Sequence, residues 1–184
     1  MTNPDTLKNW DLSKLAWKLS AKIYIGLGAN LGNPRDIFSQ AISMMSKFCC
    51  IDAVSKLYAS KPYGFDAQPD FFNAVARAST EIDPHELLAK LREIELKLGK
   101  KIIRKNGPRI IDLDILIYDE LTIESSNLTI PHPGILTRDF VILPLLELNP
   151  EFDHPSWENS LQITSQNLDK TFVFGEPLEW KYSM

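Results

Sequence analysis

Two stretches with strong helix signals alternate with stretches typical of strands, and this order limits the possible folds more than any other feature. Residues 33–48 and 83–99 begin with an Asn-Pro and an Asp-Pro pair, in which the first residue caps the helix and the proline fits its first turn. Apolar residues then recur every three to four positions, as on the buried face of an amphipathic helix. The expected buried residues are Ile37, Ala41, Met44 and Phe48 in the first helix and Leu87, Leu88, Leu91, Ile94 and Leu98 in the second.

Strand patterns flank both helices. We expect strands at 22–28, 51–60, 71–80 and within 107–119. The order strand, helix, strand, strand, helix, strand is that of a split β-α-β arrangement. The sequence therefore predicts an α/β (α+β) domain of the ferredoxin-like type, a sandwich whose mainly antiparallel sheet is covered by helices. Residues 132–150 are expected to begin as a turn and to continue as a helix that breaks near Pro144.

The chain has 184 residues, enough for one domain with a substantial core. We expect an N-terminal amphipathic extension at 1–21, a main domain at 22–155 and a C-terminal tail at 156–184. In the extension, helical spacing is carried by Leu12, Leu15, Ala16 and Leu19. The tail should pack on the main domain because it is rich in large aromatic residues, namely Trp157, Phe172, Phe174 and Trp180.

Composition and charge exclude several classes of protein. The net charge of −4 provides no basic field for nucleic acid. No segment is apolar over the length needed to cross a bilayer, and the first twenty residues resemble neither a signal peptide nor a transit peptide. The two cysteines, Cys49 and Cys50, are adjacent and form no disulfide framework or zinc motif. We therefore expect a cytoplasmic protein that binds neither nucleic acid nor membranes.

The stretch "GPRIIDLDILIYD" (107–119) places Asp112 and Asp114 two positions apart in an otherwise apolar strand. Strand side chains alternate faces, so both carboxylates point the same way. Ile110 and Leu116 are expected on that face, and the opposite, buried face is formed by Ile111, Leu113, Ile115 and Ile117. Two neighbouring carboxylates repel each other unless a cation lies between them, and Mg²⁺ favours one or two carboxylates together with substrate phosphates. The alternative is an exposed strand face with two solvated acids.

Arginine, amide and aromatic side chains supply further candidate binding residues. Arg109 directly precedes the aspartate strand, within the acid-free basic stretch 97–109, and its guanidinium suits bidentate contact with phosphate. In "DFFNAVA" (70–76), Phe71 and Asn73 share one strand face. A stacking ring beside an amide suits a flat, polar heterocycle.

Two other motifs flank these candidates. His132, Arg138 and Phe140 add a second cationic and aromatic group after the strand. The stretch "GLGANLG" (26–32) lacks the G-x-G-x-x-G spacing of a dinucleotide site. We interpret it as a tight turn from strand to helix, with Asn30 facing the same cleft.

Taken together, these motifs resemble 6-hydroxymethyl-7,8-dihydropterin pyrophosphokinase of folate biosynthesis. The resemblance runs from about Lys22 to Pro155, and its most specific part is "GPRIIDLDIL", close to the family signature G-P-R-x-x-D-L-D. Further matches, in order along the chain, are "GANLGNP", "QPDFFNA", "IELKLG" and "IPHPGILTRDFVILPL". The family fold, a ferredoxin-like α/β sandwich, agrees with the order of elements derived above.

The resemblance implies that ATP, as co-substrate, donates its β,γ-pyrophosphoryl group to the hydroxymethyl oxygen of 6-hydroxymethyl-7,8-dihydropterin and leaves as AMP. It implies two Mg²⁺ ions held by Asp112 and Asp114, and catalytic roles for Arg109, Asp112, Asp114 and Lys100. The implied ATP-binding residues are Arg92, Glu95, Arg109, Ile115, Thr129, His132 and Arg138. The implied pterin-binding residues are Ser60, Lys61, Tyr63, Phe71, Asn73 and Phe140. Phe71 and Phe140 would stack on the two faces of the pterin, and Asn73 would read its amide edge.

Several residues depart from the family pattern. Lys100 stands where an arginine is usual, Ile102 and Ile103 replace residues that are often polar, and Asn106 stands where many members have an aromatic residue. Lysine lacks the guanidinium fork, so altered kinetics are expected in this loop. Two alternatives stay open: another Mg²⁺-dependent transferase, such as a nucleotidyltransferase that releases pyrophosphate, and a non-catalytic relative that binds pterin or nucleotide.

Overall fold

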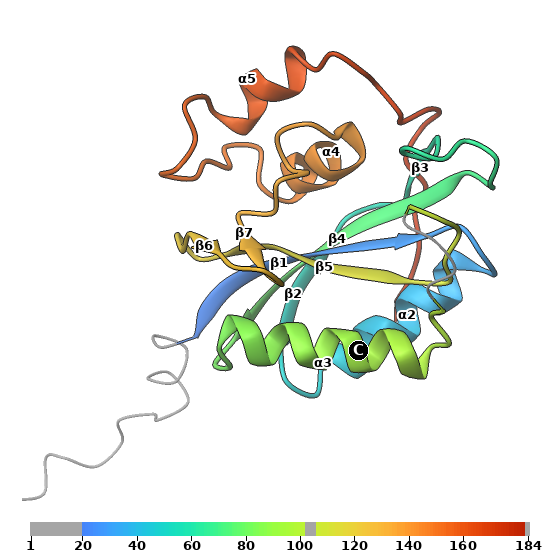
Figure 1. The fold of residues 1–184 in the computed structure, drawn as a ribbon, viewed down its shortest axis with the longest axis horizontal. Coiled ribbons are helices and arrows are strands. Elements are labelled where there is room, and N and C mark those ends of the chain that lie inside the picture. Colours follow the sequence, from blue (N-terminus) through green and yellow to red (C-terminus); the bar gives the residue numbers. More distant parts are fainter. Residues whose placement is uncertain (1–19, 102–105, 183–184) are drawn as a thin grey trace, which may run out of the picture.

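The computed structural model of the protein describes residues 20–101 and 106–182 (Figure 1). Most of the expected N-terminal extension, residues 1–19, lies outside the described residues, as do Ile102 and Ile103.

An antiparallel sheet forms the centre of the molecule. Its strands are β1 (Ala21–Ala29), β2 (Cys50–Val54), β3 (Tyr58–Ser60), β4 (Phe71–Thr80) and β5 (Asp112–Tyr118). They lie in the order β2-β4-β1-β5, with β3 also paired to β4, and every pairing among the described residues of this sheet is antiparallel. This arrangement confirms the predicted ferredoxin-like sandwich.

The strand expected at 51–60 is divided into β2 and β3. Between them the Ser55 hydroxyl accepts the backbone N–H of Val75 at 2.9 Å, and the backbone N–H of Lys56 bonds to the Glu147 carboxylate at 3.1 Å. The Ser55 N–H still donates to the Val75 carbonyl at 2.9 Å, so side-chain and backbone bonds together hold the break, which the residue types alone do not reveal.

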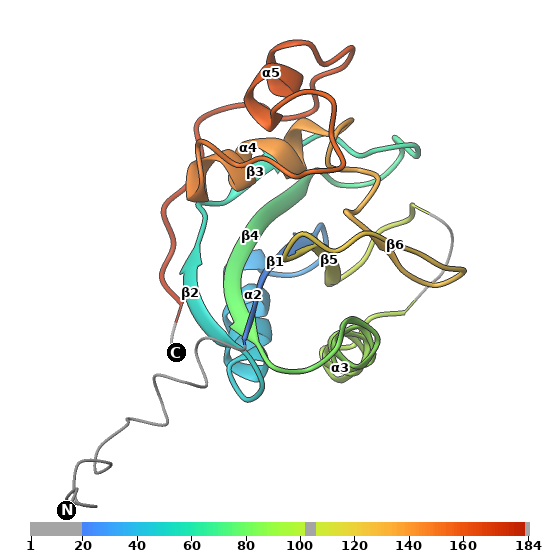
Figure 2. The ribbon, with the colours of Figure 1, turned by 90° about the vertical axis from the view of Figure 1, so that its left-hand side faces the viewer.

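Helices α2 (Pro34–Met45) and α3 (Pro84–Lys97) cover one face of the sheet (Figures 1 and 2). Their predicted caps are confirmed, because Asn33 accepts the N–H of Arg35 and Asp83 accepts those of His85 and Glu86. The predicted buried face of the first helix is confirmed at Ile37 and Ala41, and Met44 and Phe48 pack against the core but are only partly buried. Since α2 ends at Met45, Phe48 lies beyond the helix, and the residues that α2 buries are Ile37, Phe38, Ala41, Ile42 and Met45.

Helices α4 (Asp139–Leu148) and α5 (Leu161–Gln166) lie on the opposite face, and a small hairpin joins β6 (Ile123–Glu124) to β7 (Thr129–Ile130) (Figure 1). The expected break at Pro144 is wrong, because α4 continues through it. Proline removes one helical hydrogen bond, but Pro144 is buried within α4, a helix that packs on β4. Among the helices that the structure describes, none has the length and apolar character needed to cross a membrane.

Two apolar clusters pack on the two faces of the sheet, and a β-bulge decides which cluster some residues of β5 join. Tyr24 pairs with Ile117 and Ile25 with Ile115, so Leu116 is an extra residue in β5. Ile117 therefore joins Leu116 in the cluster beneath α4, whereas alternation predicted it on the opposite face. Ile110, expected on the aspartate face, lies before β5 and packs against the other cluster.

Candidate active site

The start of β5 carries a partly buried network of charged side chains. The Asp112 carboxylate lies 2.6 Å from Lys100 Nζ through Oδ1 and 2.9 Å from Arg109 Nε through Oδ2. The same ammonium lies 2.7 Å from Glu95 Oε1, which also accepts the backbone N–H of Leu113 at 2.7 Å. Two cations thus balance two carboxylates, and Lys100 ties the end of α3 to β5.

Burial is the largest influence on the pKa values of Asp114, Glu95 and Lys100 in this network. Burial, together with the nearby charges of Asp112 and Glu95, raises the pKa of the Asp114 carboxyl to about 7. Burial also raises the pKa of Glu95, against the hydrogen bonds from Lys100 and Leu113. For Lys100, burial alone would lower the pKa, but the two carboxylates raise it above its ordinary value, so the ammonium stays charged. Asp112, Asp114 and Glu95 thus form an acidic floor of the cleft that Lys100 and Arg109 balance in part, and a bound cation would favour the charged form of Asp114.

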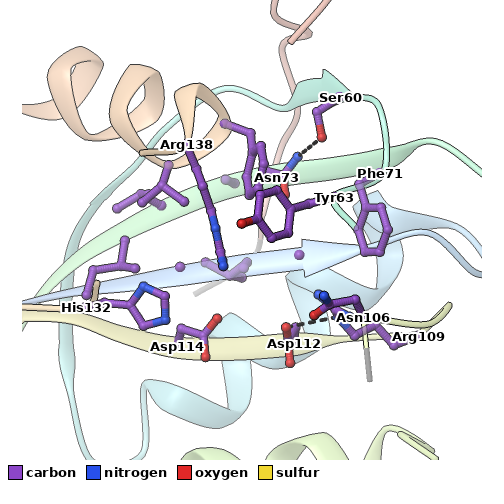
Figure 3. Close-up of a pocket in the computed structure, with 18 of the residues that line it drawn as sticks. Ser60, Tyr63, Phe71, Asn73, Asn106, Arg109, Asp112, Asp114, His132 and Arg138 are labelled. Atoms are coloured by element: carbon purple, nitrogen blue, oxygen red, sulfur yellow. Dashed lines mark hydrogen bonds and ion pairs between the residues drawn. The ribbon is translucent and has the colours of Figure 1, made fainter. Parts of the chain in front are cut away.

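An aromatic slot opens beside the carboxylates, between the start of α4 and the β3–β4 side of the sheet (Figure 3). The residues implied for pterin binding line this slot, namely Ser60, Lys61, Tyr63, Phe71, Asn73 and Phe140. Asn73 Nδ2 donates to Ser60 Oγ at 2.9 Å and to the Tyr58 carbonyl at 3.3 Å, which fixes the orientation of the amide. The Lys61 ammonium instead pairs with Asp70 at 3.1 Å and lies 4.7 Å from the centre of the Phe174 ring.

Two arginines expected beside ATP also line the aromatic slot. The Arg138 guanidinium lies 4.4 Å from the centre of the Tyr63 ring, and that of Arg109 lies 5.0 Å from the centre of the Phe71 ring. With these groups in place the open volume of the slot is only about 80 Å³. The two guanidinium groups therefore narrow the slot.

A second pocket, which we call the hairpin groove, lies between α3 and the β6–β7 hairpin and has an open volume of about 890 Å³. Most of the residues implied for ATP binding line it, together with Lys100: Arg92, Glu95, Ile115, Thr129 and His132. Asp112, Asp114 and His132 line both the groove and the slot. The two carboxylates therefore lie where the two pockets meet.

His132 is neutral in this setting. Burial, followed by the charge of Arg138, lowers its pKa to about 4. Its Nδ1 accepts the backbone N–H of Gly134 at 3.1 Å, so the proton of the neutral ring is assigned to Nε2. His132 can thus offer one N–H donor to a ligand at the junction of the pockets.

A polar network that the sequence patterns do not reveal links the end of β1 to the loop before β4 and to residues 106–109. Asn30, expected to face the cleft, donates from Nδ2 to Gln68 Oε1 and to the Pro69 carbonyl, both at 3.0 Å, and accepts the backbone N–H of Arg109 at 2.8 Å. Gln68 in turn donates to the Asn106 carbonyl at 2.8 Å. The expected turn at 26–32 is wrong in part, because Gly26 and Gly28 lie within β1 and the turn begins only after Ala29. The role of Gln68 depends on contacts that only the fold creates.

Protein side chains alone do not complete a metal site here. Among the residues that the structure describes, no three His, Cys, Asp or Glu side chains gather closely enough to hold a metal ion. Asp112 and Asp114 supply two carboxylates, and Mg²⁺ accepts phosphate oxygens and water as its remaining ligands. The donor set therefore fits Mg²⁺ that arrives together with a phosphorylated substrate.

Comparison with known proteins relates most of the chain to one family. Residues 24–150 match the family model described as 7,8-dihydro-6-hydroxymethylpterin-pyrophosphokinase. The chain is 40% identical over 153 residues to 2-amino-4-hydroxy-6-hydroxymethyldihydropteridine pyrophosphokinase of Aquifex aeolicus, covering 83% of this chain and 96% of that one. The enzyme of the same name from Haemophilus influenzae is 38% identical over 152 residues, covering 82% and 95%.

Longer proteins contain a similar segment. The folic acid synthesis protein fol1 of Pneumocystis carinii is 45% identical over 134 residues, which are 72% of this chain but 18% of that protein. The solved structure of wild-type HPPK-DHPS from Plasmodium falciparum with pteroate shares the fold, with a TM-score of 0.68 at 18% identity, over 80% of this chain and 42% of that one.

Proposed function

Because the chain belongs to the 7,8-dihydro-6-hydroxymethylpterin-pyrophosphokinase family, we propose that it transfers the β,γ-pyrophosphoryl group of ATP to 6-hydroxymethyl-7,8-dihydropterin. The hydroxymethyl oxygen attacks the β-phosphorus, the bond from the β-phosphorus to the oxygen of the α-phosphate breaks, and AMP leaves. The hydroxyl proton passes to water, and the other product is the pterin diphosphate.

One observation supports this proposal above the others: Asp112 and Asp114 lie at the junction of the hairpin groove and the aromatic slot. ATP in the groove and a flat ring in the slot would bring the phosphate chain and the hydroxymethyl group together beside these carboxylates. Positioning of this kind supplies most of the catalysis in phosphoryl transfer, because the protein provides no covalent nucleophile.

We propose that Asp112 and Asp114 hold two Mg²⁺ ions. The raised pKa of Asp114 agrees with this proposal. Two close carboxylates in a buried site repel each other when both are charged, and a cation bound between them removes this repulsion. Bound Mg²⁺ would neutralise charge on the phosphates and on the attacking oxygen. The Lys100 ammonium, now 2.6 Å from Asp112, would then turn toward the phosphates.

The remaining residues orient the two substrates. Arg109 and Arg138 bind phosphate oxygens once the pterin displaces them from the aromatic rings, and the neutral His132 donates its Nε2–H in the same place. Phe71 and Phe140 stack on the pterin, and the amide of Asn73, held by Ser60, reads its polar edge. Arg92, Glu95, Ile115 and Thr129 contact the nucleotide along the hairpin groove.

We place this reaction in the cytoplasm. The sequence has only two cysteines and no disulfide framework, as expected in a reducing compartment.

A product assay tests the function. Purified protein is incubated with Mg²⁺, ATP and 6-hydroxymethyl-7,8-dihydropterin, and nucleotides are separated by chromatography. We expect one AMP for each pterin diphosphate, and AMP only when the pterin is present. ADP would indicate simple phosphoryl transfer, free pyrophosphate would indicate a nucleotidyltransferase, and binding without turnover would indicate a non-catalytic relative; each of these results would overturn the proposal.

A further inference from the structure

The segment that follows α5, residues 171–182, runs along the free edge of β3, and we call it the C-terminal strap (Figures 1 and 2). Val173 bridges to Ser60 and Leu178 bridges to Leu57, both antiparallel. The strap lies outside the region that matches the family model, which ends at residue 150. Its contacts are therefore not part of the segment that the family model describes.

Asp139 joins the strap to the start of α4. This side chain is only 4% exposed. Its Oδ2 accepts the backbone N–H groups of Phe172 at 2.6 Å and Val173 at 2.8 Å, while Oδ1 accepts the N–H of Phe140 at 2.8 Å. A buried carboxylate needs such donors. Asp139 thus binds both the backbone of the strap and the backbone of Phe140.

The ring of Phe172 touches two rings of the aromatic slot from outside. Its centre lies 5.8 Å from that of Phe140, in an edge-to-face contact at 83°, and 5.6 Å from that of Tyr63, at 58°. Such geometries are favourable for aromatic pairs and restrict ring rotation. Phe172 thus lies behind the rings that face the pterin and is not among the residues that line the slot.

We propose that Phe172 and Asp139 are positioning residues for the pterin, with the C-terminal strap as the outer support of the aromatic slot. The inference rests on the proposed function, because it assigns the slot to the pterin. Phe172 holds the Phe140 ring in the orientation that stacks on the substrate and supports the Tyr63 ring beside it. Asp139 fixes the strap to the backbone of α4. Among the described residues, those that line the hairpin groove include none from 171–182.

Phe172→Ala tests this proposal, with Leu178→Ala as the matched control. Leu178 lies in the same strap, its side chain is 41% exposed, and its backbone bonds to Leu57 are independent of its side chain. Binding is measured by calorimetry, with 6-hydroxymethyl-7,8-dihydropterin titrated into protein containing Mg²⁺ and α,β-methylene-ATP, whose blocked α,β-bridge prevents turnover. For Phe172→Ala we expect a pterin Kd raised roughly threefold to tenfold, as for the loss of one or two aromatic contacts, and an unchanged nucleotide Kd. Leu178→Ala should leave both constants unchanged.

Two milder variants keep the test informative if Phe172→Ala does not fold. Phe172→Tyr keeps the ring and should restore the pterin Kd, whereas Phe172→Leu should remain weakened. Equal weakening of pterin and nucleotide binding would mean that the strap only stabilises the fold, and a wild-type pterin Kd in Phe172→Ala would mean that Phe172 does not position the slot. If the unmodified protein bound no pterin, the proposed function itself would fail, and that result is distinct from either outcome for the variants.

Discussion

Replacing Lys100 with methionine tests whether its ammonium neutralises the acidic floor of the cleft. Lys100 contacts Glu95 at 2.7 Å and Asp112 at 2.6 Å, and the exposed fractions of the three side chains are 15%, 8% and 23%. Methionine keeps most of the apolar stem but removes the charge. Asp112 retains Arg109, whereas Glu95 retains only the backbone N–H of Leu113 among the partners in the described residues.

Removing one partner of a buried ion pair costs about 3–5 kcal/mol, because the other charge is left uncompensated. Since Asp112 still has Arg109, we expect the lower end, a loss of about 3 kcal/mol in the free energy of unfolding. For a chain of this size such a loss lowers Tm by roughly 6–12 °C. Urea unfolding at pH 8 without Mg²⁺ measures the difference between Lys100→Met and the unmodified protein.

A double-mutant cycle with Glu95→Gln identifies the cause. Glutamine can still accept the N–H of Leu113 but carries no charge, so Glu95→Gln with Lys100→Met should recover most of the lost stability. Mg²⁺ should also stabilise Lys100→Met more than the unmodified protein, because its carboxylates have lost their internal cation. The reasoning is refuted if Lys100→Met unfolds at the wild-type urea concentration, or if the double variant is no more stable than Lys100→Met alone.

Three further predictions concern single side chains. Asp114→Ala should lower kcat by roughly a thousandfold, the effect of several kcal/mol of lost charge stabilisation, while circular dichroism shows an unchanged fold; full activity would contradict the metal assignment. Phe140→Ala should weaken pterin binding at least about tenfold through lost stacking and burial and leave ATP binding unchanged, and equal losses in calorimetry would contradict the stacking role. Burial raises the pKa of Cys49 to about 11, so only about one thousandth of this thiol is ionised at pH 8. In the folded protein one thiol per chain, that of the exposed Cys50, should therefore react quickly with a disulfide reagent. Cys50→Ser should abolish this fast phase, raising the pH toward 11 should accelerate the slow one, and two fast thiols would contradict the burial of Cys49.

Features governed by local rules could be predicted from the sequence. The caps at Asn33 and Asp83 depend on residues within the same turn, and the shared face of Asp112 and Asp114 depends only on the alternation of a strand. Alternation failed beyond Leu116, because a bulge against β1 moved Ile117 to the other face. A bulge arises from the pairing of two strands, and the residue types of β5 alone do not predict it.

Contacts between distant segments were beyond the reach of sequence patterns. Asp139 and Phe172 are separated by 33 positions and share no periodicity, so their contact emerges only when the strap returns along β3. The placement of Arg109 and Arg138 in the slot could not be predicted from the sequence for a similar reason. Each guanidinium lies over an aromatic ring, and that choice depends on side-chain packing, whereas the sequence indicates only that cations gather near the aspartates.

The start of α4 connects the two halves of the site through three consecutive residues. Arg138, which we propose binds phosphate, and Phe140 both line the slot, and Asp139 between them binds the strap. Because Lys100 contacts the carboxylates and the hairpin groove, but not the strap, a change there should alter nucleotide and Mg²⁺ binding first. Phe172→Ala should alter pterin binding first. If Lys100→Met and Phe172→Ala each changed the Kd of the nucleotide and the Kd of the pterin by the same factor, the two pockets would be rigidly coupled through α4. The separate roles assigned to the strap and to Lys100 would then be wrong.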